Sequence, residues 1–253
     1  MYWAENECGV RVYIDESNDK ERYCCPLCKG TLIRKLGSVT AHHFAHRPQA
    51  DCDPWYTNHP GKGSWHKSMQ EMFPKECQEV KVYADENPSI CHFADVFIER
   101  PGKNNIVIEF QHSAISRDVF LERTLFYRSN NCSTIEGKKI YNSVIWVFDC
   151  KWKKMFIDDS YGTPEYVHVE WTGRDRIRFL REYRPNYKDV FIVFHATKNK
   201  FIEEPYTRNK VLCFDPERKH ILINVMDQED EYRYFYGEEI LEEHFAEYIT
   251  NNL

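Results

Sequence analysis

Two acidic residues, Asp95 and Glu109, stand in neighbouring apolar segments that a short turn connects. Asp95 lies within residues 91–98, and Glu109 lies within residues 106–111. A buried carboxylate without a partner is costly, so acids in such segments commonly face a metal ion or another cation. The spacing therefore indicates a hydrolase that uses Mg²⁺ or Mn²⁺ to cut a phosphodiester bond.

The chemistry requires both carboxylates to reach the same point. If the two segments pair as antiparallel strands around a turn at 101–104, Asp95 and Glu109 can point to the same edge. Gln111 projects from the same strand face as Glu109, and its amide is able to orient an attacking water. His66, on an expected helix, is a candidate proton carrier, although a lone helical histidine is more often structural. The candidate catalytic residues are Asp95, Glu109, Gln111 and His66, with Asp95 and Glu109 as metal ligands.

A structural alternative exists for both acids. Each can form a salt bridge with a basic residue nearby in the sequence, and spacing alone favours catalysis only slightly. The basic residues in question are Arg100, Lys103 and Arg123. Glu79 and His92 are weaker candidates for the site, because each is more often an ordinary strand residue.

A second group of reactive side chains lies near the N-terminus. Cys25 and Cys28 form a CxxC pair, and an HxxH pair, His43 and His46, begins fifteen residues later. Two thiolates and two imidazoles at these spacings match the tetrahedral preference of structural Zn²⁺. The alternative is a pair of free thiols beside an incidental histidine-rich loop. Substitutes for a misassigned ligand are Cys24, His42 and Cys52.

The elements that would hold the acids follow from hydrophobic periodicity. Ser64 is a plausible N-cap for a helix over 65–73, and Ser116 for a helix that ends near Ser129. The unbroken apolar run at 105–111 predicts a strand buried on both faces. The other expected strands are 79–84, 91–98 and 143–148. The predicted order is helix, three strands, helix, strand.

Composition divides the chain into three parts. Residues 1–60 hold the Cys/His cluster, 61–150 alternate helix and strand signals, and 151–253 are rich in aromatic and β-branched residues. The last part predicts a β-rich accessory region. Its expected elements are strands at 166–171, 190–195, 210–214 and 220–225 and a helix at 238–248. An arginine cluster between 174 and 184 is more often a solvated face than a nucleic-acid contact.

Global composition restricts the class of protein. With 253 residues, 42% hydrophobic and 15% aromatic, the chain can bury a substantial core. No apolar run approaches a membrane span, and the acidic, polar start is unlike a signal peptide. We therefore expect a cytoplasmic protein whose ten cysteines are reduced. The net charge of −6 argues mildly against indiscriminate nucleic-acid binding.

Several blocks of the sequence resemble the competence protein CoiA-like family over residues 23 to about 150. In the acidic region these blocks are HFAD at 92–95, VIEFQHSAIS at 107–116, ERTLFY at 122–127 and VIWVFD at 144–149. Near the N-terminus they are YCCPLC at 23–28 and HFAH at 43–46, which resemble the zinc-binding head of that family. The resemblance implies an α/β, restriction-endonuclease-like αβββαβ core of the PD-(D/E)XK type, linked to DNA uptake and recombination.

The resemblance also assigns roles. Asp95 matches the acidic metal ligand, Glu109 the second acid, and Gln111 the position usually held by lysine. The helix acid of such nucleases has no clear match, although Glu71 or His66 can stand in its place. In the family pattern an arginine recurs beside the acids, so Arg123 either contacts the scissile phosphate or neutralises Glu109 when no metal is present.

Three functions remain open at this stage. The leading one is a Mg²⁺- or Mn²⁺-dependent DNA endonuclease with a zinc-stabilised N-terminal module. The second is a catalytically weak or inactive module that binds DNA or protein and retains a nuclease-like core. The third is a subunit that cuts only with a helicase or recombinase partner. A homodimer is plausible, because cutting both strands needs two sites.

Overall fold

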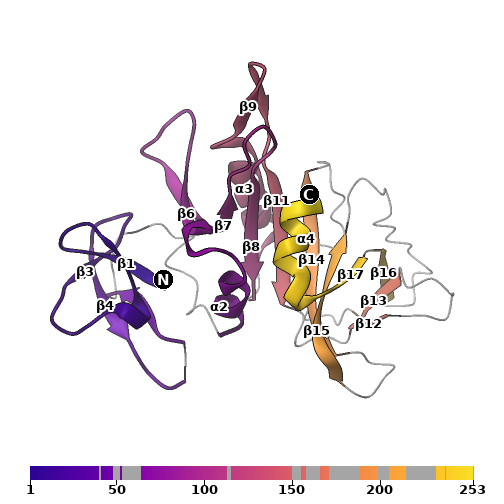
Figure 1. Ribbon diagram of the computed structural model, residues 1–253, viewed down its shortest axis with the longest axis horizontal. Coiled ribbons are helices and arrows are strands. Elements are labelled where there is room, and N and C mark those ends of the chain that lie inside the picture. The colour runs from indigo at the N-terminus through magenta and orange to yellow at the C-terminus, as the bar shows by residue number, and fades with distance from the viewer. Residues whose placement is uncertain are drawn as a thin grey trace. The chain divides into compact units, whose positions relative to one another are not determined.

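The computed structural model describes most of the first 149 residues and shorter segments thereafter (Figure 1). The described residues are 1–39, 41–47, 52, 64–112, 115–149, 155–157, 166–170, 189–198, 205–214, 232–236 and 238–252. The chain divides into two compact units, residues 1–69 and 70–253. The division falls inside helix α2 (Ser64–Glu71), which was expected at 65–73.

The first unit is built on a five-stranded antiparallel sheet of order β2-β1-β3-β4-β5. Its strands are β1 (Trp3–Asn6), β2 (Arg11–Tyr13), β3 (Tyr23–Cys24), β4 (Thr31–Lys35) and β5 (His43–His46), and the 3-10 turn η1 (Ile14–Glu16) follows β2. One small cluster forms its core: Tyr2, Ala4, Ile14, Tyr23, Cys25, Leu32 and Phe44. So few buried side chains make a bound metal a useful additional source of stability.

The second unit contains a seven-stranded mixed sheet of order β17-β15-β14-β11-β8-β7-β6. In chain order its strands are β6 (Gln78–Tyr83), β7 (Cys91–Ile98), β8 (Ile106–Gln111), β11 (Ser143–Asp149), β14 (Val190–Lys198), β15 (Pro205–Phe214) and β17 (Glu238–Leu241). The helices are η2 (Lys75–Cys77), α3 (Arg117–Ser129), η4 (Glu242–His244) and α4 (Phe245–Asn252). The remaining strands are the hairpin β9 (Ser133–Ile135) and β10 (Lys138–Ile140), and the small sheet of β12 (Met155–Ile157), β13 (Tyr166–Glu170) and β16 (Tyr232–Tyr236).

The order of elements from α2 to β11 is the predicted one, with the hairpin β9–β10 inserted before β11. Strands β6, β7 and β8 pair antiparallel, whereas β8 and β11 pair parallel and α3 lies between them in the chain. Every residue of β8 and of β11 is buried, which confirms the expected burial of β8 on both faces. The connection from β8 to β11 runs through helix α3, and a helix is the usual connection between parallel strands.

Helix α3 begins where the sequence predicted. The hydroxyl oxygen of Ser116 accepts a hydrogen bond from the backbone N–H of Val119 at 3.3 Å and so caps the first turn. One turn further along the helix, the ring of Phe120 packs against that of Trp146 on β11, with 4.7 Å between the ring centroids. The side chain of Trp146 also donates to the Thr124 hydroxyl at 2.9 Å. These contacts fix α3 against one face of the sheet.

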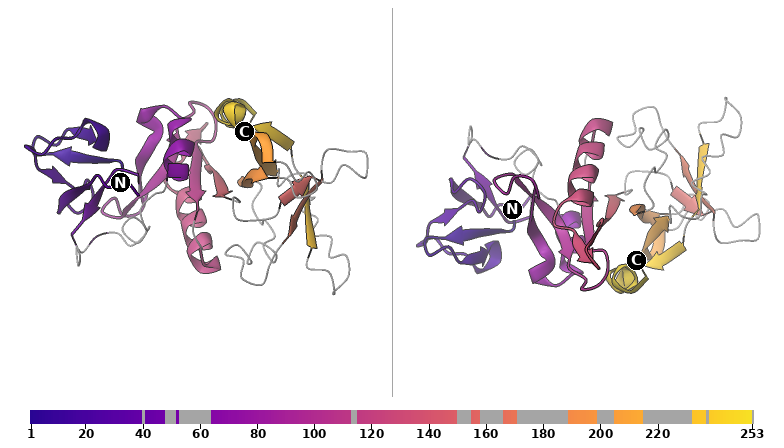
Figure 2. Two further views of the ribbon diagram at one scale, coloured as in Figure 1. Left: turned by 90° about the horizontal axis from the view of Figure 1, so that it is seen from below. Right: turned by 90° about the horizontal axis from the view of Figure 1, so that it is seen from above.

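The opposite face of the sheet is covered by α4 and by Phe73, which follows α2. Phe73 lies 6.4 Å from Phe110 of β8 and 6.1 Å from Phe245 of α4, between ring centroids. Figure 2 shows α3 and α4 on opposite sides of the strands. The sheet of the second unit is therefore the middle layer of three, as a strand buried on both faces requires.

The C-terminal region contains one wrong prediction. The helix expected at 238–248 is instead strand β17, then the turn η4, and only then helix α4 from Phe245. Glu238 to Leu241 pair antiparallel with β15, so sheet pairing overrides the helical periodicity of the sequence. The expected strands at 166–171, 190–195 and 210–214 overlap β13, β14 and β15, and the strand at 220–225 and the arginine cluster lie outside the described residues.

The three-part division of the chain remains a prediction. Strand β14 pairs parallel with β11, so the C-terminal region extends the sheet that carries the acids.

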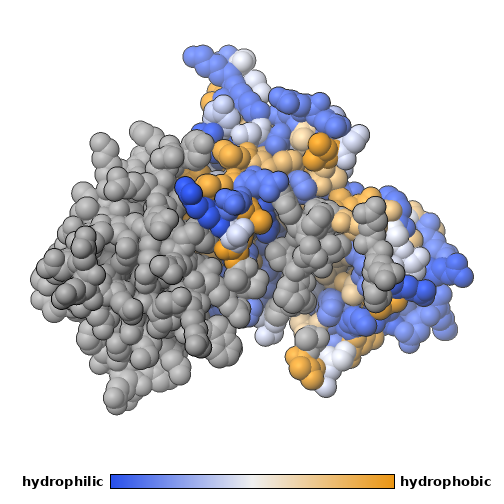
Figure 3. All heavy atoms as spheres, turned by 180° about the vertical axis from the view of Figure 1, so that it is seen from behind, coloured by the Kyte–Doolittle hydropathy of each residue, from blue (hydrophilic) through white to orange (hydrophobic). Residues whose placement is uncertain are grey.

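Within the described residues, every helix is too short or too polar to serve as a membrane span. Figure 3 shows hydrophilic residues over the protruding top of that view. The β9–β10 hairpin exposes Lys138 and Lys139.

The packing of α3 gives a first prediction. Phe120 is fully buried against Trp146, whereas Leu125 on the same helix is 45% exposed. We expect Phe120→Ala to lower the free energy of unfolding by about 3–5 kcal/mol, because it leaves a cavity in the core. Leu125→Ala should change it by less than about 1 kcal/mol. Urea denaturation measures both, and equal losses in the two variants would contradict this packing.

Candidate functional site

The two acids meet where the pairing of β7 and β8 ends. The strands pair from Ile98 opposite Ile106 to Val96 opposite Ile108, so the next opposed residues are Asp95 and Glu109. At this position the two carboxylates accept hydrogen bonds from the backbone of the opposite strand. Glu109 Oε1 accepts from the Asp95 backbone N–H at 3.4 Å, and Asp95 Oδ2 accepts from the Phe110 backbone N–H at 2.9 Å. Each carboxylate is thus held by the backbone of the opposite strand.

Both acids are buried, and a cation lies on one of them. Asp95 is 8% exposed and Glu109 is 1% exposed. Arg123 of α3, itself 4% exposed, donates from its guanidinium to Glu109 Oε2. The guanidinium carbon also lies 5.4 Å from the centre of the Trp146 ring, within cation–π range. The salt bridge that the sequence offered as an alternative for Glu109 is therefore present.

The electrostatics of this group follow from its burial. Burial alone would lower the pKa of Arg123, but the charge of Glu109, with smaller contributions from Tyr127 and Asp95, raises it above the usual value. Burial first, and then the charge of Glu109, raise the pKa of Tyr127 well above its usual value. The guanidinium therefore stays charged and the phenol stays neutral. The Tyr127 hydroxyl donates to the Phe93 carbonyl at 2.6 Å, which ties α3 to β7 beside the acids.

Two glutamines adjoin the acids. Gln111, 5% exposed, ends β8 on the same strand face as Glu109. Gln70, 1% exposed, donates from its side-chain amide to the Asp95 carbonyl at 2.8 Å. Sequence reasoning missed Gln70 and considered Glu71, which is exposed at the end of α2. The available signal was the position of Gln70 three residues before Phe73, on the apolar side of the helix.

Two further candidates have different surroundings. His66 is buried on α2, on the first-unit side of the division, so its catalytic role remains a prediction. Glu79 is 2% exposed and has φ of 47°, in the left-handed region that non-glycine residues rarely adopt. It lies between the positions that pair Gln78 with Val96 and Val80 with Ala94. Its register position therefore faces Asp95 from the other neighbouring strand.

A histidine–aspartate pair at the end of the sheet was also missed. His112 Nδ1 lies 2.5 Å from Asp149 Oδ2, and the Asp149 side chain is fully buried while that of His112 is 42% exposed. Asp149 is in register with His195 of β14, which is 2% exposed. His112 directly follows Gln111 in the chain, but its partner Asp149 is 37 residues away.

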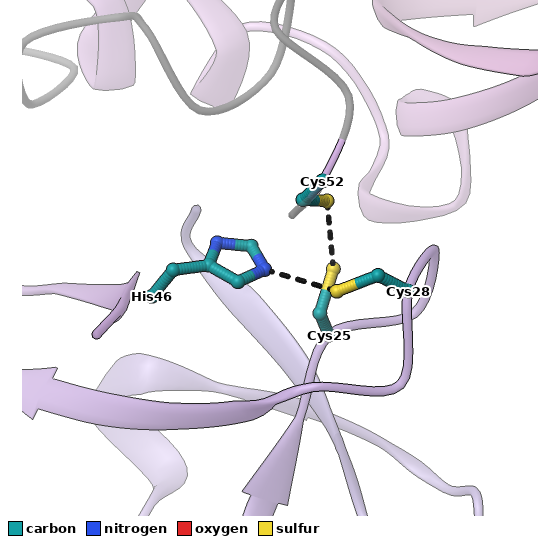
Figure 4. Close-up of side chains that lie close together, drawn as sticks. All are labelled: Cys25, Cys28, His46 and Cys52. Atoms are coloured by element: carbon teal, nitrogen blue, oxygen red, sulfur yellow. Dashed lines mark hydrogen bonds between the residues drawn. The ribbon is translucent and has the colours of Figure 1, made fainter. Parts of the chain in front are cut away.

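The cysteine cluster brings four ligands together (Figure 4). Cys25, Cys28, His46 and Cys52 each offer one ligand atom, and all four atoms lie within 4.8 Å of one another. Cys25 Sγ is 3.8 Å from Cys52 Sγ, and Cys28 Sγ is 3.3 Å from His46 Nε2. Three thiols and one imidazole suit a tetrahedral Zn²⁺ site. The cluster could therefore bind zinc.

The fourth ligand differs from the predicted set. Cys52, named only as a substitute, joins the cluster, while His43 does not. His43 and His46 are three residues apart on β5, and residues an odd number apart on a strand point to opposite faces. His43 Nδ1 lies 2.8 Å from the Ala41 carbonyl oxygen instead. An HxxH pair on a strand can supply only one of its imidazoles to a single ion.

The backbone N–H groups favour thiolate sulfurs, whereas the raised pKa values of two thiols mean that a metal ion has to displace their protons. The N–H groups of Leu27 and Gly30 approach the sulfurs of Cys25 and Cys28, each at 3.4 Å. Burial raises the pKa of Cys25 and, with the neighbouring Cys25 charge, that of Cys52. Thiols in such a place need a cation to become thiolates, so zinc binding should release protons.

The acid pair fits a different kind of metal. Among the described residues, the cysteine cluster is the only group of three or more Cys, His, Asp and Glu side chains close enough together to hold a metal ion. The acids therefore offer two carboxylates, with the Gln111 amide oxygen on the same strand face. Oxygen donors of this kind suit Mg²⁺ or Mn²⁺, which retain several waters. The donor type fits, and the contact of Arg123 with Glu109 Oε2 is its one competitor among these groups.

Both sites lie in segments of the chain that match protein-family models. Residues 10–54, which include the cysteine cluster, match the model of the competence protein CoiA N-terminal domain. Residues 78–156, which include both acids and Arg123, match that of the CoiA nuclease-like domain. The second unit therefore carries a nuclease-like domain.

The chain belongs to the competence protein CoiA family, as the resemblance in the sequence indicated. Searches of curated proteins and of solved structures found no match.

The ligand set gives a second prediction. We expect Cys52→Ser to lower the zinc affinity by at least about 100-fold, since even changes beyond the ligand shell cause losses of 10–100-fold. His43→Gln should bind zinc as the wild type does. Zinc content after dialysis against a graded chelator measures both. Loss of zinc from His43→Gln, with zinc retained in Cys52→Ser, would show that His43 is the fourth ligand.

The knuckle of the cluster gives a third prediction. A Cβ atom at Gly30 would lie 3.1 Å from Cys28 Sγ, whereas one at Gly37 would meet nothing within 4 Å. We expect Gly30→Ala to displace the Cys28 sulfur and to speed zinc release to a chelator roughly tenfold. Gly37→Ala is the matched control and should release zinc at the wild-type rate. Equal rates in both variants would mean that the sulfur has room to move.

Proposed function

We propose that the protein is a metal-dependent deoxyribonuclease that hydrolyses phosphodiester bonds during DNA uptake, recombination or defence. The observation that carries this proposal is the buried pair of Asp95 and Glu109, in register on adjacent strands of a nuclease-like domain. Such a pair is costly to bury unless it serves a cation. DNA is the proposed partner, and a helicase or recombinase is a further one.

The arrangement of the strands supports a restriction-endonuclease-like core of the PD-(D/E)XK type. The elements α2, β6, β7, β8, α3 and β11 follow in the order of that core. Asp95 takes the place of its first acid, Glu109 that of the second, and Gln111 that of the lysine. The exact core topology is part of the proposal.

The proposed mechanism gives each side chain a separate task. Asp95 and Glu109 would hold Mg²⁺ or Mn²⁺, which when bound lowers the pKa of a water and offsets charge on the phosphate. The backbone N–H groups of Asp95 and Phe110 fix the orientation of the two carboxylates. The Gln111 amide orients the attacking water or the phosphate by hydrogen bonds but accepts no proton. His66 remains the candidate proton carrier.

The zinc cluster has a structural task in this proposal. It stabilises a unit whose core is small, since Cys25 belongs both to that core and to the cluster. A folded N-terminal unit can then present its surface to DNA. The zinc ion itself takes no part in hydrolysis.

A second function has one observation in its favour. Gln111 carries no charge where such nucleases usually have lysine, and Arg123 already neutralises Glu109. A module that binds DNA or protein without cutting it would tolerate both features. The two functions differ in whether the acids are needed for DNA cleavage or only for folding.

The fourth prediction separates them. Zinc-loaded protein is incubated with labelled single-stranded, duplex and branched DNA in Mg²⁺, Mn²⁺ or EDTA. We expect cleavage only with a divalent ion, and a loss of at least about 10²-fold in Asp95→Asn and Glu109→Gln. Asp85→Asn is the control, because Asp85 forms an exposed ion pair with Lys139 and should leave cleavage unchanged.

The outcomes are distinct. Products that form equally in EDTA would exclude a metal-dependent nuclease. Absence of products from every DNA, with unchanged DNA affinity in Asp95→Asn and Glu109→Gln, would favour the binding module. Cleavage that begins only when a helicase or recombinase is added would identify a partner-dependent subunit.

A further inference from the structure

We propose that Arg123 is the resident cation of the acid pair and competes with a divalent metal ion for Glu109. The inference rests on the proposed function, because it takes Asp95 and Glu109 as a metal site. It adds a regulatory property: the site is stable without metal, and metal binding has to displace an internal charge.

The contacts of Glu109 carry the first step. Both of its oxygens have a donor, since Oε1 accepts from the Asp95 N–H and Oε2 accepts from Arg123. With Glu109 1% exposed and Arg123 4% exposed, water screens neither charge well. A divalent ion on the same carboxylate would lie close to the guanidinium, and like charges repel strongly in such surroundings. The two cations therefore exclude one another at Oε2.

The anchoring of α3 carries the second step. Phe120 and Tyr127, one turn before and after Arg123, are fully buried. Trp146 packs against Phe120 and donates to Thr124, so the backbone at Arg123 is held in place. Only the long arginine side chain is left to move. Displacement of Arg123 from Glu109 is accordingly a side-chain rotation and leaves the sheet intact.

The chemistry of the guanidinium carries the third step. Once Glu109 binds a metal ion, the charged group needs another anion, because it cannot deprotonate. Its planar fork matches the oxygens of a phosphate group. A DNA phosphate at the acid pair would supply that anion. Metal and DNA would then bind together more readily than either binds alone.

The test measures Mn²⁺ binding and needs no cleavage. Zinc-loaded, full-length protein is titrated with Mn²⁺, and free Mn²⁺ is followed by electron paramagnetic resonance. We expect Arg123→Gln to bind Mn²⁺ more tightly than the wild type, by a factor between about 5 and 150, as for coupled sites in general. Arg123→Lys keeps the charge and should stay within about threefold of the wild type, well below the coupling range.

Arg128 offers the matched control. It lies on the same helix but contacts different groups: its Nε donates to Asp189 at 2.8 Å, and its guanidinium lies over the Tyr141 ring. Arg128→Gln removes the same charge from α3 and should leave Mn²⁺ affinity unchanged. Equal tightening in Arg123→Gln and Arg128→Gln would reduce the effect to net charge and overturn the proposal. So would Mn²⁺ affinity in Arg123→Gln that is unchanged or weaker.

A second measurement covers a variant that folds poorly. Arg123→Gln leaves Glu109 without its cation, so we expect a lower melting temperature that Mn²⁺ raises by more than in the wild type. The double variant Arg123→Gln, Glu109→Gln should regain stability and lose this response to Mn²⁺. If Mn²⁺ fails to stabilise Arg123→Gln, the ion does not replace the guanidinium and the proposal is wrong.

Failure of the proposed function would give a different result. Tighter Mn²⁺ binding in Arg123→Gln, without DNA cleavage by the wild type, would support the competition and reject the nuclease. Metal-dependent cleavage by the wild type, with Mn²⁺ affinity independent of Arg123, would do the reverse.

Discussion

The burial of two carboxylates side by side is the constraint on which the second unit depends. Glu109 is almost inaccessible to water, and an unpaired ion there would cost several kcal/mol. The protein meets this cost with backbone N–H groups from the paired strands and with one guanidinium from α3. The helix must therefore stay in place, and Phe120, Thr124 and Tyr127 each tie it to the sheet. Packing and electrostatics support the same arrangement.

The C-terminal strands matter to this site although they carry none of its residues. Strand β14 pairs with β11, and β15 and β17 continue the sheet beyond it. Strand β11 is thereby central, which buries Trp146 under Arg123. The same pairing aligns His112, Asp149 and His195 at the carboxyl ends of parallel strands, where ligands of α/β proteins commonly bind. The C-terminal region, predicted from the sequence to be accessory, therefore supplies three strands of the sheet that carries the acids.

In the first unit one residue belongs both to the hydrophobic core and to the candidate metal site. Its sheet has short strands and a small core, and Cys25 serves that core while offering its sulfur to the cluster. A zinc ion on the cluster would add four coordination bonds to a unit whose hydrophobic core is small. If the cluster binds zinc, metal binding and the stability of this unit would therefore be coupled.

The sequence by itself determined what neighbours along the chain can fix. Periodicity located α2, α3 and the strands β6, β7, β8 and β11, and a four-residue turn was enough to place Asp95 opposite Glu109. The CxxC pair likewise identified two members of the cysteine cluster. Only the tertiary structure decided the partners that are distant in the chain: Cys52 in place of His43, Gln70 on Asp95, and Asp149 on His112. It also turned 238–241 from helix into strand. Such contacts depend on sheet order and register, because a local pattern does not state which distant strand or helix it will meet.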